Sequence, residues 1–172
     1  MTDALRYTML GLSLLVAGCA LNAEKGKTTQ GLGGRNHEQK VVKTTAYTDS
    51  ESGHRRYGVK NAIGSHLQSG SINSAAADWS HFPLGTKFRI VDNDKTYVVD
   101  DYGSALVGTD SIDLYVPSPR LMNQWGSRRV TIEVLEKGSF EKSLELLKPR
   151  QGNWHVRQMV KNIQKEIDDA TY

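Results

Sequence analysis

The sequence predicts a mainly β protein, a small β-barrel with one short helix and a helical C-terminal extension. Short segments between residues 41 and 137 alternate apolar and polar side chains, and glycine- and aspartate-containing turns separate them, as is typical of short strands. From residue 138 onward apolar side chains recur every three or four positions, which is typical of amphipathic helices. At 172 residues, 38% hydrophobic and 24% charged, the chain is long enough for one domain with a real core. The net charge of +3 gives no reason to expect a nucleic-acid partner, and we expect a monomer.

Residues 1–19 have the pattern of a lipoprotein signal peptide. Residues 7–18 form a leucine-rich apolar run that is too short to span a bilayer well. The run ends in VAGC, which resembles a bacterial lipobox, and its Cys19 is the only cysteine of the chain. We therefore expect Cys19 to carry a lipid anchor in the cell envelope. Ala20 stands where an inner-membrane retention aspartate would follow, which favours the outer membrane, facing the periplasm.

The segment at the very start of the chain leaves an ordinary signal peptide or a mis-set start codon as the alternative. The segment before the apolar run holds one cation, Arg6, and an acid, Asp3.

Residues 20–40, which follow the predicted signal peptide, are rich in Gly, Lys, Thr, Asn and Gln and are too polar to order themselves. They predict a flexible tether with a reach of roughly 25 Å, from which an anchored domain would search a nearby insoluble polymer.

The barrel domain is expected over residues 41–137. Val41–Thr48 is β-rich and mostly alternating, which predicts a strand, and Asp49–Asn73 predicts a long loop with at most one short strand. Residues 74–78 are interpreted as leading into a turn at Pro83–Thr86. Ser118 as N-cap, Pro119 and a C-capping Gly126 predict one short helix on the strands. Further strands are expected at Lys87–Val91, Thr96–Val99, Ile112–Val116 and Arg128–Lys137.

Residues 138–172 are expected to form a helical extension. Phe140, Leu144 and Leu147 fall on one helix face, and a second run follows Pro149 and Gly152. The apolar faces are expected to cover the barrel or a partner, and no catalytic chemistry is expected in this part. The apolar positions of the second run are Val156, Met159, Val160 and Ile163.

The chemistry is expected between Asp100 and Val116. In the strand that ends this stretch, Ile112 and Leu114 share one face, so Asp113 points the other way, beside Tyr115. Asp101 and Asp113 flank a glycine-containing turn and are expected to approach each other. Two neighbouring carboxyl groups suit acid/base work on a glycosidic bond. The alternative is that these aspartates only cap their own turns.

Other site classes have weaker support. His54, His66 and His81 lack metal-ligand spacing, so neither a metal nor a cofactor is expected. Residues 54–56 (HRR) are interpreted as a solvated basic loop, with binding of a sugar or carboxylate as the alternative. A Ser-His-Asp triad lacks a nucleophile elbow, and an aspartic protease lacks its D-T/S-G pair.

Six short motifs in order resemble the three-aspartate domain shared with the membrane-bound lytic murein transglycosylase A family. The resemblance covers about Val41–Leu135, with one residue more than usual between Gly108 and Asp113. Asp100 and Asp101 both remain candidates for the second aspartate, and their spacing to the glycines favours Asp101. The motifs are Thr45–Thr48, Ala77–Asp78, Pro83–Thr86, Asp101–Gly108, Ile112–Tyr115 and Trp125–Gly126.

The resemblance implies a six-stranded double-psi β-barrel and cleavage of the peptidoglycan bond between N-acetylmuramic acid and N-acetylglucosamine. The reaction is nonhydrolytic and leaves a 1,6-anhydro product. Asp113 would be the acid/base, with its pKa raised by an apolar wall and by Asp101, and Asp78 would orient them or be structural. Substrate contacts are expected from the motif residues Thr45, Tyr47, Tyr102 and Tyr115.

A second function class stays open at this point. The related expansin-like barrels imply a non-catalytic module that binds or loosens the cell wall. The presence of all three aspartates favours the enzyme. The short chain favours binding, because it lacks the large second domain that holds glycan in the transglycosylase A family.

Overall fold

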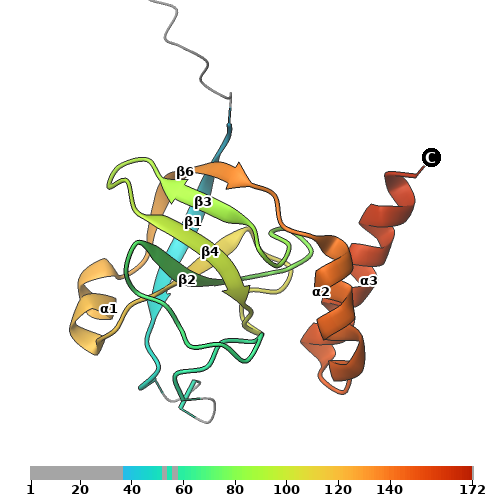
Figure 1. Cartoon of the computed structure of the whole chain (residues 1–172), viewed down its shortest axis with the longest axis horizontal. Helices are drawn as coiled ribbons and strands as arrows, with labels where there is room; N and C mark the ends of the chain where they lie inside the picture. The colour runs from blue at the N-terminus through green and yellow to red at the C-terminus, as the bar shows by residue number, and fades with distance from the viewer. Residues whose placement is uncertain (1–36, 52–53, 56–57, 172) are drawn as a thin grey trace, which may run out of the picture. The chain divides into compact units, whose positions relative to one another are not determined.

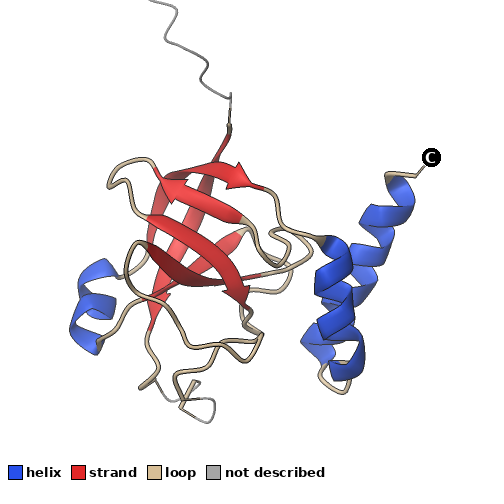
Figure 2. Cartoon of the chain, viewed as in Figure 1, coloured by secondary structure: helices blue, strands red, loops and turns tan. Residues whose placement is uncertain are grey.

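The computed structural model describes residues 37–51, 54–55 and 58–171, and over these residues the protein is mainly β (Figures 1 and 2). The predicted signal peptide, the predicted lipidation site Cys19 and most of the predicted tether lie outside the described residues. The described part is a closed six-stranded barrel with helix α1 (Pro119–Trp125) on one side. Helices α2 (Phe140–Leu147) and α3 (Trp154–Asp169) lie on the other side. No described helix is long and apolar enough to cross a membrane.

The strands close in the order β1-β5-β2-β4-β3-β6. The pairs β1–β5 and β2–β4 are parallel, and the other four pairs are antiparallel. Parallel neighbours require crossover connections rather than hairpins, so distant parts of the sequence meet in one wall. This arrangement confirms the small six-stranded barrel. The strands are β1 (Glu38–Tyr47), β2 (Ile72–Ala77), β3 (Lys87–Ile90), β4 (Thr96–Asp101), β5 (Ser111–Tyr115) and β6 (Arg128–Glu136).

Three elements differ clearly from the sequence prediction, and one of them is β4, which continues past the expected end at Val99 to Asp101. β1 begins at Glu38, three residues before the expected start, and β2 was not expected as a strand at all. The β2 sequence INSAAA is buried at five of its six positions, so it shows no alternation of apolar and polar residues. Alanine is also a weak strand former. Pairing with β4 on one side and β5 on the other therefore holds this segment extended.

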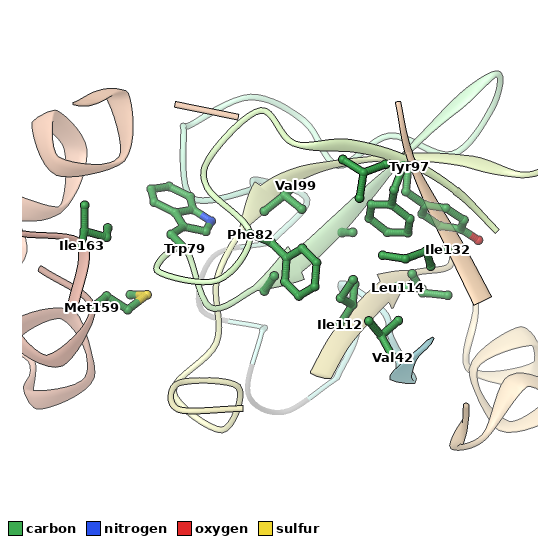
Figure 3. Packing of buried hydrophobic residues seen from close by; sticks show 14 of the residues in the cluster. Val42, Trp79, Phe82, Tyr97, Val99, Ile112, Leu114, Ile132, Met159 and Ile163 are labelled. Atoms are coloured by element: carbon green, nitrogen blue, oxygen red, sulfur yellow. The ribbon is translucent and has the colours of Figure 1, made fainter. Parts of the chain in front are cut away.

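The barrel interior is filled by large aliphatic and aromatic side chains. Phe88 and Ile90 are fully buried. Ile132 is also fully buried, together with Ile112 and Leu114 of β5, whose alternation was predicted (Figure 3). The same cluster continues into the helices. Close packing of this kind makes the helical extension part of one core with the barrel. The buried helix residues are Leu144, Leu147, Val156, Met159, Val160 and Ile163, and Figure 3 shows Met159 and Ile163 on the side of Trp79.

A tight junction joins the barrel to α2 at Gly138. A Cβ atom at this position would lie 2.2 Å from the Pro83 carbonyl oxygen and 2.5 Å from that of Leu84. Hydrogen bonds cross the same junction, from the Gly138 amide to Thr86 Oγ1 (3.1 Å) and from the Leu84 amide to Ser143 Oγ (2.9 Å). The turn at Pro83–Thr86 is therefore the surface on which the helical extension docks.

Candidate active site

A row of side chains crosses four neighbouring strands on the outside of the barrel. Ala76 of β2 stands opposite Asp113 of β5 and also opposite Asp101 of β4. Asp113 in turn stands opposite Thr45 of β1. Directly opposed residues share a face, and Asp113 alternates with the buried Ile112, so this row lies outside the core. Strand spacing puts the two aspartate Cα atoms about 10 Å apart, with only the Ala76 methyl between them.

A β-bulge decides which of the two adjacent aspartates faces the site. The β2–β4 register shifts between Ala75 and Ala76. Ala75 pairs with Val99 and Ala76 pairs with Asp101, so Asp100 is the extra residue between them. Bulges of this type redirect a side chain. Asp100 turns to a buried network and accepts hydrogen bonds from Asn61 Nδ2 (2.9 Å) and Ser74 Oγ (2.7 Å). Asp101 is therefore the aspartate that shares the outer face with Asp113.

Each site carboxylate is held by a neighbouring hydroxyl. Thr45 Oγ1 donates to Asp113 Oδ1 (2.9 Å), and the Tyr47 hydroxyl donates to Asp101 Oδ2 (3.1 Å). The Tyr102 backbone amide donates to Asp101 Oδ1 (2.9 Å). Since Thr45 and Tyr47 both lie on β1, one strand positions both acids.

A second apolar cluster, separate from the barrel core, forms a wall beside the acids. It contains Tyr47, Ala76, Leu106 and Tyr115, with the partly buried Leu67 packed against it. The Tyr47 and Tyr115 rings meet edge to face at 5.6 Å. Such a wall removes water from the neighbouring carboxyl groups and disfavours their charged forms.

The pKa of each acid reflects this wall. Burial raises the pKa of Asp113 to about 6; the Thr45 hydrogen bond opposes the rise, and the negative charges of Glu51 and Asp101 add to it. Burial also raises the pKa of Asp101 to about 6, although the hydrogen bonds from Tyr102 and Tyr47 and the nearby His54 favour its ionised form. Of the two predicted causes for Asp113, burial by the apolar wall is therefore the larger and repulsion from Asp101 the smaller.

The third predicted aspartate, Asp78, serves a different set of contacts. It is fully buried, and its Oδ1 accepts hydrogen bonds from the Ser80 amide (2.8 Å) and hydroxyl (2.7 Å). Its Oδ2 accepts from the Gly108 amide (2.7 Å). Among the described residues, these bonds tie the loop before β5 to the end of β2. The contacts of Asp78 are therefore those of a structural residue, which is one of the two roles that the sequence left open.

Three of the four predicted substrate-contact residues lie at the site, and the side chain of the fourth, Tyr102, does not. Thr45, Tyr47 and Tyr115 lie at the acids or in the apolar wall, and the Tyr115 hydroxyl reaches Asp49 Oδ1 (3.4 Å). The Tyr102 ring instead packs against Trp79 in the main core, so only its backbone amide serves the site.

Sequence reasoning also missed part of the site. Leu67 and Leu106 lie in loops without periodicity, so no pattern marked them as wall residues. His54 was weighed as part of a basic loop and as a metal ligand, yet its ring lies 5.4 Å from that of Tyr47. Its positive charge favours the ionised form of Asp101, a site role that the sequence pattern did not indicate.

The two raised pKa values predict a pH dependence of stability. Asp101 and Asp113 titrate near pH 6 when folded and near about 3.9 when unfolded, so the folded state binds more protons between these values. Their contribution to stability is therefore fully present below about pH 4 and is lost as the pH rises through 6. We expect the melting temperature of the wild type, measured relative to an Asp101→Asn/Asp113→Asn double variant, to fall between pH 4 and 7. If the melting temperatures of the two proteins change in the same way between pH 4 and 7, the raised pKa values of Asp101 and Asp113 are contradicted.

The arrangement supplies two carboxyl groups that exchange protons near neutral pH beside an apolar wall. No group of three or more metal-ligating side chains is found among the described residues. Residues 73–136 match the family model described as the 3D domain, which is found in cell-wall-active proteins such as lytic transglycosylases. No curated protein matches the chain.

Proposed function

Because residues 73–136 match the 3D (three-aspartate) domain model, we propose that the protein is a lytic transglycosylase acting on peptidoglycan glycan strands. The observation that carries the proposal is the pair Asp113 and Asp101, on either side of Ala76, each with a pKa of about 6. A general acid works best when its pKa lies near the working pH.

Asp113 acts first as the acid and then as the base. Its proton goes to the glycosidic oxygen, the bond from that oxygen to C1 of N-acetylmuramic acid breaks, and N-acetylglucosamine leaves with a free O4 hydroxyl. The O6 hydroxyl of the same muramyl residue then attacks C1 and gives its proton to the Asp113 carboxylate. A 1,6-anhydro ring forms, Asp113 is protonated again, and no water is consumed. Thr45 holds the Asp113 carboxyl throughout by its 2.9 Å hydrogen bond.

Asp101 stabilises the positive charge that develops at C1. When ionised, it offers a negative charge across the Ala76 gap from Asp113, held by Tyr47 and by the Tyr102 amide. Preorganised charges of this kind act strongly in sites that exclude water. The wall of Tyr47, Leu106 and Tyr115 keeps that environment dry on one side.

The test is incubation of purified murein with the soluble domain beginning at residue 37, followed by mass spectrometry of the released material. The proposal expects 1,6-anhydro-muropeptides, which weigh 18 mass units less than hydrolysed products because one water is missing. Reducing-end products of normal mass would make the protein a hydrolase. Binding to murein without any release would instead support the non-catalytic wall-binding module.

We also propose that the protein is a lipoprotein of the cell envelope, anchored through Cys19 and facing the periplasm. The support is the apolar run that ends in VAGC at the only cysteine. A Cys19→Ala variant is expected to stay unprocessed and to lose metabolic labelling with palmitate. Normal processing of this variant, with unchanged membrane fractionation, would refute the anchor.

A further inference from the structure

A chain of aromatic rings leads from the aspartate site to the helical extension. The fully buried Trp79 donates its Nε1 hydrogen to the Asp101 carbonyl oxygen (2.8 Å), and the Tyr102 ring lies edge to face against it at 5.1 Å. The Tyr102 ring in turn lies 6.1 Å from the ring of His155, at the start of α3. The indole of Trp154 follows at 5.8 Å from His155. The main chain at Asp101 and the first turn of α3 are therefore joined through consecutive ring contacts.

Trp154 does not serve the packing of its own helix. At 60% exposure it is the most exposed of the large hydrophobic side chains in the described part of the chain. The buried face of α3 is built from Val156, Met159 and Ile163, and Trp154 stands about 200° around the helix from Val156. An exposed indole gains little from folding and offers a flat apolar face to a ligand.

The surroundings of Trp154 specify what that ligand would be. Asn153, the residue before Trp154, is exposed and makes no side-chain cap bond to α3. Residues 148–157 (KPRQGNWHVR) contain cations and no acidic residue. An exposed aromatic face preceded by an exposed amide side chain suits the apolar C–H face and the hydroxyl rim of a sugar. The absence of acids suits a glycan that carries carboxylates on its peptide side chains.

We propose that Trp154 is a stacking platform for a sugar residue of the peptidoglycan strand, placed beyond Asp101 along the path of the glycan. The inference rests on the proposed substrate, peptidoglycan, and goes beyond the proposed chemistry by giving the helical extension a role in binding. The ring contacts through Tyr102 and His155 fix where the platform stands relative to the acids.

The test is the binding of insoluble murein sacculi in a sedimentation assay, in the Asp113→Asn background so that the polymer is not cleaved. Adding Trp154→Ala is expected to weaken binding roughly three- to tenfold, since one aromatic stacking contact is removed. Trp154→Tyr should retain most of the affinity, because it keeps an aromatic face. The matched control is Val41→Ala, which alters a side chain of similar exposure (58%) on β1 and should leave binding unchanged.

The outcomes separate this inference from the proposed function. Equal binding with and without Trp154→Ala, in variants with the same melting temperature, would overturn the platform even if the wild type releases 1,6-anhydro products. Weaker binding for Trp154→Ala but not for Val41→Ala would support the platform, even if the wild type releases no product and the transglycosylase proposal fails. A loss in Trp154→Tyr as large as in Trp154→Ala would also overturn it.

Discussion

Replacement of Asp113 by asparagine is expected to reduce the release of 1,6-anhydro-muropeptides on the order of 100-fold or more. Asparagine keeps the shape of the side chain and can still accept from Thr45 Oγ1, but it carries no proton that can be given and taken back. The fold should persist, because removing a carboxyl with a raised pKa removes a cost of burial. The measurement is product release by mass spectrometry, with circular dichroism to confirm that the variant is folded.

The matched variant is Asp101→Asn, which should lose less activity. It should also move the pH profile slightly downwards, because a neutral neighbour no longer raises the pKa of Asp113. That shift should be small, since the charge of Asp101 contributes less to the Asp113 pKa than burial does. Near-wild-type release by a folded Asp113→Asn protein would show that the acid/base lies elsewhere.

Replacement of Gly138 by alanine should have the largest effect on stability. The added methyl group would lie 2.2 Å from the Pro83 carbonyl oxygen and 2.5 Å from that of Leu84, and both obstacles are backbone atoms that cannot rotate away. The junction between the barrel and α2 must therefore shift. We expect a loss of about 2–4 kcal/mol in the free energy of unfolding, measured by denaturant titration.

Gly152→Ala is the control for this prediction. Gly152 lies in the turn before α3, and a Cβ atom there meets nothing within 4 Å. Its substitution should change stability by less than about 1 kcal/mol. If Gly138→Ala is as stable as Gly152→Ala, the helical extension does not dock on the Pro83–Thr86 turn as described.

The sequence predicted most of the fold because most elements have one buried face. The strands β3, β5 and β6 alternate, as in Val130, Ile132 and Val134 of β6, which are buried while their neighbours are not. Helices α2 and α3 repeat their apolar residues at helical spacing and bury them as predicted. β2 escaped prediction because it is covered on both sides and built largely of alanine.

The missing strand also determines how the two acids stand relative to each other. Asp101 and Asp113 were expected to approach each other across a glycine-containing turn, and in the structure β2 lies between their strands. Their separation is therefore set by sheet spacing and by the small side chain of Ala76, and neither is visible without β2. The roles of Asp100 and Asp78 depend on a bulge and on a loop contact across 30 residues, which sequence periodicity does not encode.

The place of β1 in the barrel also has a mechanical consequence. The N-terminal segment enters the described structure at Glu38, so any tension in it is applied along β1. That strand is bonded to β6 from Glu38 to Thr44 and to β5 from Lys43 to Tyr47. Because these bonds run across the strands, a pull along β1 shears them together instead of opening them one after another. The load enters at Glu38, the opposite end of β1 from Thr45 and Tyr47, so the pairings with β6 lie between the load and the two hydroxyls that hold the acids.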